Sequence, residues 1–557
     1  MGHGKHCVVI VVREGITVSM KRRMIQTLAT LVLFVAPQGW AEDSKELLPA
    51  AVAAELQELS LTQEDAPMGV DPSVLLQFYG ERENAPMWSG DDLAFTRAEA
   101  LVARLEDAAR EGLEPDAYAD AITAWKTREP APDAHAAARL ELLLSAATVR
   151  YVTDLAFGRI DPSSVSEELF DIPRRPDAVN LLWDVQAVAD VGLWLDGMAP
   201  PWPQYRALRR ALAGLRTLEE DDAAALLPDG DSLKPGMHND LIPILRERLT
   251  AFGVALDGDS ASTVFDPELE AAVMAFQRHH GLDDDGVVGR KTRAMLNMTV
   301  AQRIRIVELN MERLRWLQED LGNRYIWINI PAFQLSVIED GQEVLAMDVI
   351  VGRDYRSTPV FSGLMTYVDF NPYWNVPHKL AVEDILPKVQ ADPEYLASHG
   401  FKVFAGWTSD EPLDPATIDW NSLTETSFGY RLRQDPGEHN ALGRVKFMLP
   451  NEHSIYLHDT PNRALFSRAE RAFSSGCVRL SQPVDMALYL LGGSGDWSQE
   501  RLDEIWAEPE LTRVSLERPI PVYFSYMTAW VDQDGVLQFR ADVYQRDVAL
   551  DAVLSAH

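Results

Sequence analysis

The sequence predicts a multidomain α+β protein in which all-α regions precede a β-rich domain with a helical insertion. Three observations support this fold class. The chain has 557 residues, which is enough for three or four domains of about 100–200 residues each. Apolar residues recur at helical spacing up to about residue 318. From residue 324 they alternate with polar residues, as in strands.

The first 41 residues have the pattern of a signal peptide. Lys21-Arg22-Arg23 is a basic start, Leu28 to Ala36 is a short apolar stretch, and Gly39-Trp40-Ala41 offers small residues for cleavage after Ala41. The apolar stretch is too short to span a bilayer, and no stop-transfer segment follows, so an uncleaved anchor is the less favoured alternative. We therefore expect export to a Gram-negative periplasm without stable membrane insertion, with Met20 or Met24 as alternative starts.

The charge excludes one class of partner. Removing residues 1–41 takes away five Lys/Arg and one Glu, which changes the formal net charge from −34 to −38. Nucleic-acid binding needs a basic surface, so no nucleic acid is expected as a partner. An acidic, solvated exterior explains the charge best.

Helical patterns dominate up to residue 323. Residues 42–71 are acidic and weakly periodic, which predicts a flexible lead-in, and residues 72–232 form a predicted helical scaffold domain. Within the scaffold domain, amphipathic stretches cover residues 98–109, 140–157 and 205–215, without a catalytic constellation. A linker helix is expected over residues 301–323.

Residues 233–300 form a predicted three-helix module. Asp266 can cap a helix that begins with Pro267 and ends at Gly281. The acidic cluster at residues 283–285 lacks the ligand spacing of a calcium loop and fits a tight turn, and the adjacent His279 and His280 point in different directions on a helix. The sequence therefore predicts no metal site here. A generic packing unit remains an alternative to a binding module.

The β-rich domain is expected over residues 324–545. Ile326, Ile328 and Ile330 alternate with polar or aromatic residues, and Asp340-Gly341 is a hairpin turn signal. Further strands are expected at residues 364–370, 446–449 and 455–457. The polar stretch 378–429 is interpreted as a helical lid insertion, and residues 546–557 as a tail.

One thiol is the candidate nucleophile. Cys7 lies in the predicted signal peptide, so Cys477 is the single cysteine of the exported chain and has no disulfide partner within it. A thiol attacks as the thiolate and needs a base or positive charge nearby. His458 follows a predicted strand and is the candidate base. Gly476 allows a tight turn that frees amides for an oxyanion, and Arg479 supplies a fixed charge.

These residues resemble the L,D-transpeptidases with a YkuD-type catalytic domain. That family has a histidine and then S-x-G-C-[VI]-R, which stands here as His458 and residues 474–479 (Ser-Ser-Gly-Cys-Val-Arg). Many members have a histidine where this chain has Ser475, and the serine matches the large periplasmic branch. Residues 276–296 also resemble a peptidoglycan-binding module, in the pattern FQ…GL…DG.vG..T...L.

The resemblance implies a reaction and a site. Cys477 would attack the third residue of a tetrapeptide stem, release D-alanine, and pass the acyl group to another stem as a 3→3 cross-link. His458 would move the protons, with a backbone carbonyl near Asp459 orienting its ring. Peptidoglycan donor and acceptor stems are the implied partners, with other cell-wall enzymes as further candidates. No cofactor or metal is implied, and carbapenems are expected to acylate the thiol. The implied substrate-binding residues are Arg479, Ser475, Gly476, Tyr456 and Trp374.

Other functions remain open at this point. Water in place of the acceptor amine would make the protein an L,D-carboxypeptidase, and the acyl group could also be passed to a lipoprotein. A wall-binding scaffold with an inactive catalytic domain is the non-enzymatic alternative. A papain-like peptidase is disfavoured because its histidine follows its cysteine, and a zinc peptidase because the histidines lack ligand spacing.

Overall fold

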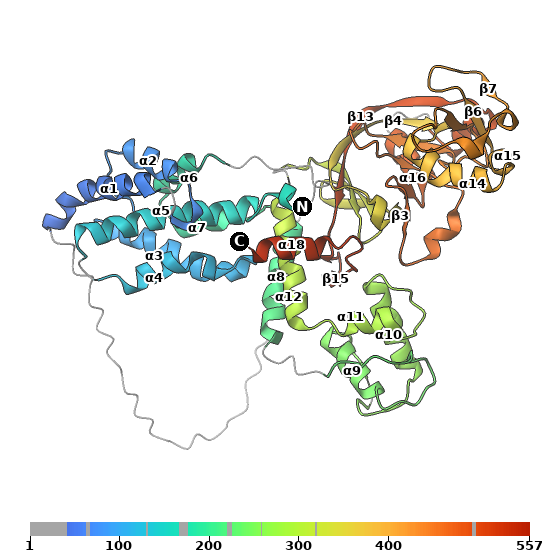
Figure 1. Ribbon diagram of the computed structural model, residues 1–557. Coiled ribbons are helices and arrows are strands. Elements are labelled where there is room, and N and C mark those ends of the chain that lie inside the picture. The colour runs from blue at the N-terminus through green and yellow to red at the C-terminus, as the bar shows by residue number, and fades with distance from the viewer. Residues whose placement is uncertain are drawn as a thin grey trace, which may run out of the picture.

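The computed structural model describes most of the chain and contains both predicted halves. Figure 1 shows long helices on one side, a β-rich region on the other, and the paired helices α8 and α12 between them. The expected signal peptide lies outside the described residues. Within the described segments, no helix has both the length and the apolar character needed to cross a bilayer. These segments are residues 42–62, 67–129, 132–165, 176–219, 225–257, 259–317, 320–492 and 497–556.

Helices α1 to α8 form the N-terminal region around α5, most of whose residues are buried. Aspartate side chains fix several helix starts: Asp91 accepts a hydrogen bond from the amide of Ala94, and Asp133 accepts one from the amide of Ala136. The predicted helices at residues 98–109, 140–157 and 205–215 fall within this region. The bounds are α1 Glu42–Thr62, α2 Pro72–Gly80, α3 Asp92–Glu106, α4 Ala119–Thr127, α5 Ala134–Phe157, α6 Ala178–Ala187, α7 Val191–Gly197 and α8 Pro203–Glu219.

The prediction of a flexible lead-in over residues 42–71 is wrong. Residues 42–62 form α1, which packs along α5. Leu48, Val52 and Leu56 lie four residues apart and are buried. A single apolar stripe is enough to dock a helix on a neighbour, even when its other faces are acidic.

The three-helix module consists of α9 (Ile242–Ala251), α10 (Pro267–His279) and α11 (Arg290–Leu296). Asp266 caps α10 by accepting a hydrogen bond from the amide of Leu269 at 2.8 Å. The side chain of Gln277 ties the following turn together, because its amide nitrogen donates to Asp285 and its oxygen accepts from the amide of Gly286. The acidic turn is therefore held by internal hydrogen bonds, as its turn chemistry predicts.

The strands of the β-rich domain close into a ring that positions the site. Helix α12 (Val300–Arg315) leads into it, and β3 hydrogen-bonds to β2 on one side and to β12 on the other, so the order β3-β12-β10-β9-β4-β13-β1-β2 returns to β3. Asp340 (φ 47°) and Gly341 (φ 78°) form the predicted hairpin turn between β2 and β3. The bounds are β1 Arg324–Asn329, β2 Gln334–Glu339, β3 Gln342–Gly352, β4 Ser362–Phe370, β9 Val445–Met448, β10 Leu457–His458, β11 Ala472–Ser474, β12 Val478–Leu480 and β13 Thr512–Ser525; helices α16 Pro483–Leu491 and α17 Gln499–Ala507 follow β12.

The insertion contains the predicted helices and, in addition, a small sheet that the sequence did not predict. It has its own four-stranded sheet in the order β5-β8-β6-β7 and its own buried core, which includes Val376, Leu396 and Val403. Its strands have two to four residues each, too few to show a recognisable alternation in the sequence. The bounds are β5 Trp374–Asn375, α13 His378–Leu380, a π-helical turn Ala381–Ile385, α14 Leu386–Ala391, α15 Tyr395–Ser398, β6 Phe401–Phe404, β7 Pro412–Leu413 and β8 Arg431–Gln434.

The predicted tail is instead a docked helix. After the hairpin β14 (Ala529–Val531) and β15 (Leu537–Phe539), residues Arg546–Ser555 form α18, which lies between the N-terminal helices and the β-rich domain (Figure 1). Leu550 and Leu554 are buried in a cluster with Trp316. Asp547 accepts a hydrogen bond from Arg313 of α12 at 2.5 Å, so α18 is fixed to the linker helix.

Candidate active site

Two adjacent short strands bring the candidate nucleophile and base close together in the sheet. Strand β10 runs parallel to β12, with Leu457 opposite Val478 and His458 opposite Arg479. Cys477 is the residue immediately before β12, and His458 is the last residue of β10. Because the strands are parallel neighbours, residues 19 positions apart in the sequence lie in one site.

The turn before Cys477 has a left-handed backbone at Gly476, where φ is +113°. A Cβ atom at this position would lie 3.2 Å from Ile455, so the turn requires glycine for both conformation and space. The hydroxyl of Ser474 donates to the carbonyl of Cys477 at 2.6 Å and accepts from the amide of Gly476 at 3.1 Å. The amide of Cys477 donates to no acceptor in the described part of the chain, so it is available to a ligand.

Thr358 holds this turn from behind, a role that no pattern in the sequence indicates. Its side chain is fully buried. Its hydroxyl donates to the carbonyl of Gly476 at 2.8 Å and accepts from the amide of Gly352 at 2.9 Å. A guanidinium nitrogen of Arg546, on α18, donates to the carbonyl of Thr358 at 3.3 Å. The nucleophile turn is therefore braced by the end of β3 and by the C-terminal helix.

The thiol of Cys477 is partly exposed and surrounded by polar groups. Its sulfur donates to the carbonyl of Ser454 at 3.9 Å. Burial raises the pKa of the thiol, while the backbone and hydroxyl of Tyr456 and the charges of Lys446 and Arg479 oppose this rise. Near neutral pH the thiol is therefore mostly protonated. The neighbouring positive charges and hydrogen bonds nevertheless favour the thiolate form.

His458 is buried and neutral. Burial, followed by the charge of Arg479, lowers the pKa of its imidazole to about 3. Its Nδ1 atom hydrogen-bonds to the carbonyl of Asp459, as the sequence predicted, which leaves Nε2 as the acceptor. In the described segments His458 and Cys477 form no mutual hydrogen bond. Such bonds commonly form only when substrate is bound.

The two predicted aromatic residues contact each other, and one of them contacts the thiol. The hydroxyl of Tyr456 contacts both Cys477 and the side chain of Trp374; burial and Cys477 raise the pKa of the phenol, whereas the contact with Trp374 lowers it. Trp374 also packs against the core of the insertion. Tyr456 therefore connects the nucleophile to the insertion.

Arg479 and Ser475 have different environments. The guanidinium of Arg479 makes no hydrogen bond or ion pair with any described residue, and its Nε atom is buried. Ser475 accepts a hydrogen bond from Arg356 at 3.2 Å. Arg356 in turn binds Glu383 and Asp384 in the π-helical turn of the insertion, each at 2.5 Å. This residue, which the sequence did not single out, joins the insertion to the nucleophile turn.

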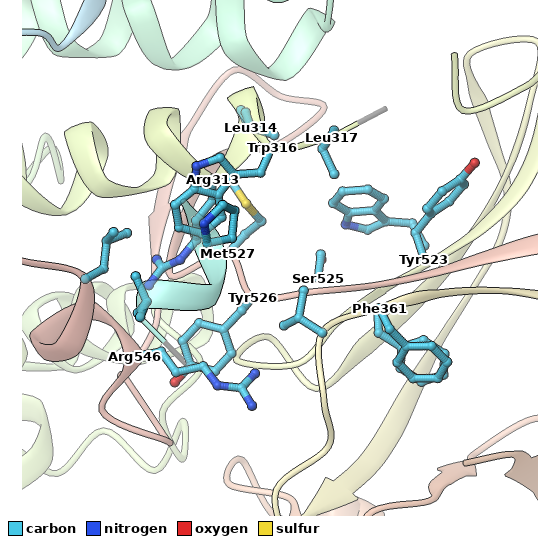
Figure 2. Close-up of a pocket in the computed structure, with 16 residues that line it drawn as sticks. Arg313, Leu314, Trp316, Leu317, Phe361, Tyr523, Ser525, Tyr526, Met527 and Arg546 are labelled. Atoms are coloured by element: carbon cyan, nitrogen blue, oxygen red, sulfur yellow. The ribbon is translucent and has the colours of Figure 1, made fainter. Parts of the chain in front are cut away.

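A cavity lies away from this site. Figure 2 shows it at the junction of α12, β13 and α18, with Trp316, Tyr523, Met527 and Arg546 around it. It has about 750 Å³ of space, part of it open to solvent, and neither Cys477 nor His458 lines it. Val165 and Leu317 also line it.

Family profiles match three parts of the chain. They are a scaffold domain at residues 73–212, a peptidoglycan-binding domain at residues 238–296, and the YkuD-type L,D-transpeptidase catalytic domain at residues 323–495. Residues 323–495 are an L,D-transpeptidase catalytic domain. The thiol, imidazole and free amide described above all belong to this catalytic domain.

Individual proteins are also similar to this chain. A Haemophilus influenzae protein named "Putative L,D-transpeptidase" is 40% identical over 239 residues, which is 43% of this chain and 47% of that protein. The chain thus spans about half the length of the curated relative it matches. Solved L,D-transpeptidases from Stackebrandtia nassauensis (13% identity, 54% of this chain, 97% of the other, TM-score 0.21) and Xylanimonas cellulosilytica (14%, 54%, 100%, 0.18) are also similar.

Proposed function

We propose that the protein forms 3→3 cross-links between peptidoglycan tetrapeptide stems through a thioester on Cys477. The observation that carries the proposal is the arrangement inside the catalytic domain: a partly exposed thiol, a free amide beside it, a neutral imidazole on the adjacent strand and an unpaired guanidinium. A nucleophile, a base, an oxyanion donor and a carboxylate-binding cation are the groups that acyl transfer requires.

In the first half-reaction, Nε2 of His458 accepts the thiol proton while the sulfur attacks the carbonyl carbon of the diaminopimelate residue. The amide of Cys477 donates to the resulting oxyanion. The bond to D-alanine then breaks, D-alanine leaves as the amine with the proton from His458, and the thioester remains. The hydrogen bond to the Asp459 carbonyl keeps the ring in the tautomer that this step needs.

In the second half-reaction, the side-chain amine of an acceptor stem attacks the thioester. The amine loses a proton to His458, the carbon–sulfur bond breaks, and the sulfur regains the proton. Water in place of the amine would give the L,D-carboxypeptidase reaction.

The charge of the site fits stem peptides, which carry carboxylates. The protein as a whole is strongly acidic, yet Arg479 faces the thiol without a carboxylate partner. A bidentate guanidinium–carboxylate pair would orient the donor stem.

The peptidoglycan-binding domain lies next to the loop that joins His458 to Cys477. Asp283 accepts a hydrogen bond from the amide of Ala469 at 3.2 Å, and Lys291 pairs with Glu470 at 2.5 Å. These contacts support glycan strands as the ligand that brings stems to the site. A wall substrate also places the enzyme outside the cytoplasm, in the periplasm if the chain is exported by residues 1–41.

The insertion acts as a lid over the acyl-enzyme. Trp374, at its base, contacts Tyr456 beside the thiol, and Arg356 connects its π-helical turn to Ser475. π-helical turns often occur at functional sites, and closing segments exclude water from reactive intermediates. Exclusion of water favours transfer to an amine over hydrolysis.

Incubation of the protein lacking residues 1–41 with purified tetrapeptide muropeptides, followed by mass analysis, tests the proposal. We expect 3→3 cross-linked dimers and free D-alanine, both lost in Cys477→Ala. Tripeptides without new dimers would support the carboxypeptidase instead. Cross-linking by Cys477→Ala would refute the nucleophile.

Intact-mass measurement with a carbapenem tests the thiol independently of the acceptor. A strained β-lactam carbonyl resembles the scissile amide, so we expect one adduct on the peptide that contains Cys477, with slower formation in His458→Ala. His135→Ala is the matched control, because this histidine lies on the N-terminal region with a side chain 63% exposed. An unmodified mass after long incubation would favour a wall-binding scaffold without activity.

A further inference from the structure

Lys446 carries a positive charge into the active site from a strand that the motif does not include. It lies on β9, opposite His458 of β10 on one side and opposite Asp369 of β4 on the other. Its Nζ atom is 3.9 Å from the centroid of the Tyr456 ring. Within the described segments, the ammonium forms no hydrogen bond and no ion pair.

The nearest candidate counterion is occupied elsewhere. Asp369 accepts two hydrogen bonds from the guanidinium of Arg513, at 2.7 and 3.0 Å. A bidentate pair of this kind satisfies the carboxylate. Lys446 therefore forms no ion pair with Asp369, although the charge of this carboxylate still favours the ammonium, and the face of the Tyr456 ring lies beside its Nζ atom.

The face of Tyr456 relays this charge toward the sulfur. A cation above an aromatic ring interacts with the electron density of that ring. In a phenol, this withdrawal of density makes the hydroxyl a stronger hydrogen-bond donor, and the hydroxyl of Tyr456 contacts Cys477. We propose that Lys446 is a positioning residue that stabilises the Cys477 thiolate through the ring and hydroxyl of Tyr456.

The other charged and titratable groups around the thiol leave this role to Lys446 and Arg479. His458 is neutral, so no imidazolium supplies the charge. The charge of Lys446 opposes the effect of burial on the thiol pKa, and it also helps to hold the His458 pKa down. The groups that face the site are Tyr456 and His458 from β10, Lys446 from β9, Arg479 from β12, Arg353 after β3, Asp369 from β4, Arg513 from β13, and Asp384 and Glu383 from the insertion through Arg356.

The inference explains how a weak base can serve this nucleophile. An imidazole with a pKa of about 3 accepts a proton reluctantly. A fixed cation lowers the free energy of the thiolate, which offsets part of the cost of this transfer, although the same charge disfavours the imidazolium. This role rests on the proposed function of Cys477, and it assigns a task to a residue on a strand outside the histidine–cysteine motif.

The test is the pH dependence of Cys477 alkylation by iodoacetamide, an uncharged probe whose rate reports the thiolate population. In Lys446→Met and Lys446→Gln, we expect the apparent thiol pKa to rise by about one unit, so that alkylation near neutral pH is roughly tenfold slower. Lys446→Arg should restore most of the rate. Lys126→Gln, on the N-terminal region with a side chain 62% exposed, is the matched control.

A double-mutant cycle tests the route through the ring. In Tyr456→Phe, which keeps the ring and loses the hydroxyl, Lys446→Met should slow alkylation clearly less than in the wild type. An equal effect in both backgrounds would refute the relay. If only the anionic probe iodoacetate were slowed, Lys446 would be an anion-attracting charge and the inference would be overturned.

The failure of this inference is separable from that of the proposed function. An unchanged alkylation profile in both Lys446 variants would overturn the role of Lys446 and leave the nucleophile assignment intact. Retained cross-linking by Cys477→Ala would instead remove the proposed function. Circular dichroism of each variant shows whether it is folded. If both neutral variants unfold, Lys446→Arg becomes the test. Alkylation of Lys446→Arg at the wild-type rate supports the role of the charge, and tenfold slower alkylation refutes it.

Discussion

Replacing Thr358 with valine tests whether the nucleophile turn depends on its brace. The change keeps the shape of the side chain and removes one hydroxyl, which is fully buried and bonded to the carbonyl of Gly476 and the amide of Gly352. Each buried backbone group left without a partner costs about 1–3 kcal/mol, so for these two groups we expect a loss of about 2–6 kcal/mol in the free energy of unfolding of the catalytic domain. For a domain of this size, each kcal/mol shifts Tm by roughly 2–4 °C.

The assay is thermal unfolding together with the rate of carbapenem acylation. We expect Thr358→Val to lower the Tm of the catalytic domain by roughly 4–24 °C and to slow acylation at least tenfold, because Cys477 loses its fixed position. Thr358→Ser keeps the hydroxyl and should acylate at close to the wild-type rate. If Thr358→Val melted and acylated like the wild type, the brace would not position the nucleophile.

Three further perturbations follow from the structure. Gly476→Ala should slow acylation strongly, since φ of +113° strains any side chain there; a wild-type rate would contradict this. Burial raises the pKa of the Asp154 carboxyl to about 6, which is above its value in the unfolded chain. The free energy of unfolding therefore falls as the pH rises from about 4 to about 6, by up to about 3 kcal/mol. Asp154→Asn should therefore melt higher than the wild type at about pH 8 and not at about pH 4, as calorimetry can show. Arg356→Gln releases Asp384 from the nucleophile turn. In single-turnover assays, we expect it to slow transfer of the acyl group to acceptor stems more than it slows the first acylation. Equal slowing of the two steps would remove the lid role.

The parts of the site that sequence alone predicted are those that lie close together along the chain. His458 and residues 474–479 belong to adjacent parallel strands, so a short motif contains both. Thr358 lies 118 residues from Gly476, and Arg356 lies 119 residues from Ser475. The spacing of residues along the chain does not indicate such pairs, because only the folded ring of strands brings their members together. Lys446 was hidden in the same way, as one charged residue in a predicted strand.

The elements of the fold divide in the same way, into those set by local sequence, which were predicted, and those set by distant contacts, which were missed. The helical half, the switch to strands and the Asp340-Gly341 hairpin follow from periodicity and turn chemistry, which are local. Helices α1 and α18 were missed because each is stabilised by a partner far away in the sequence: α5 for the first, and α12 for the second. The sheet of the insertion was missed because strands of two to four residues carry no readable period.

The place of α18 in the fold has a consequence for how the protein matures. The histidine and cysteine are synthesised well before Arg546, yet the guanidinium of Arg546 closes the support behind Thr358 and the nucleophile turn. A chain that stops before Arg546 would keep every residue of the motif and still lack this support. The position of Cys477 is thus fully supported only once α18 has been synthesised and has docked.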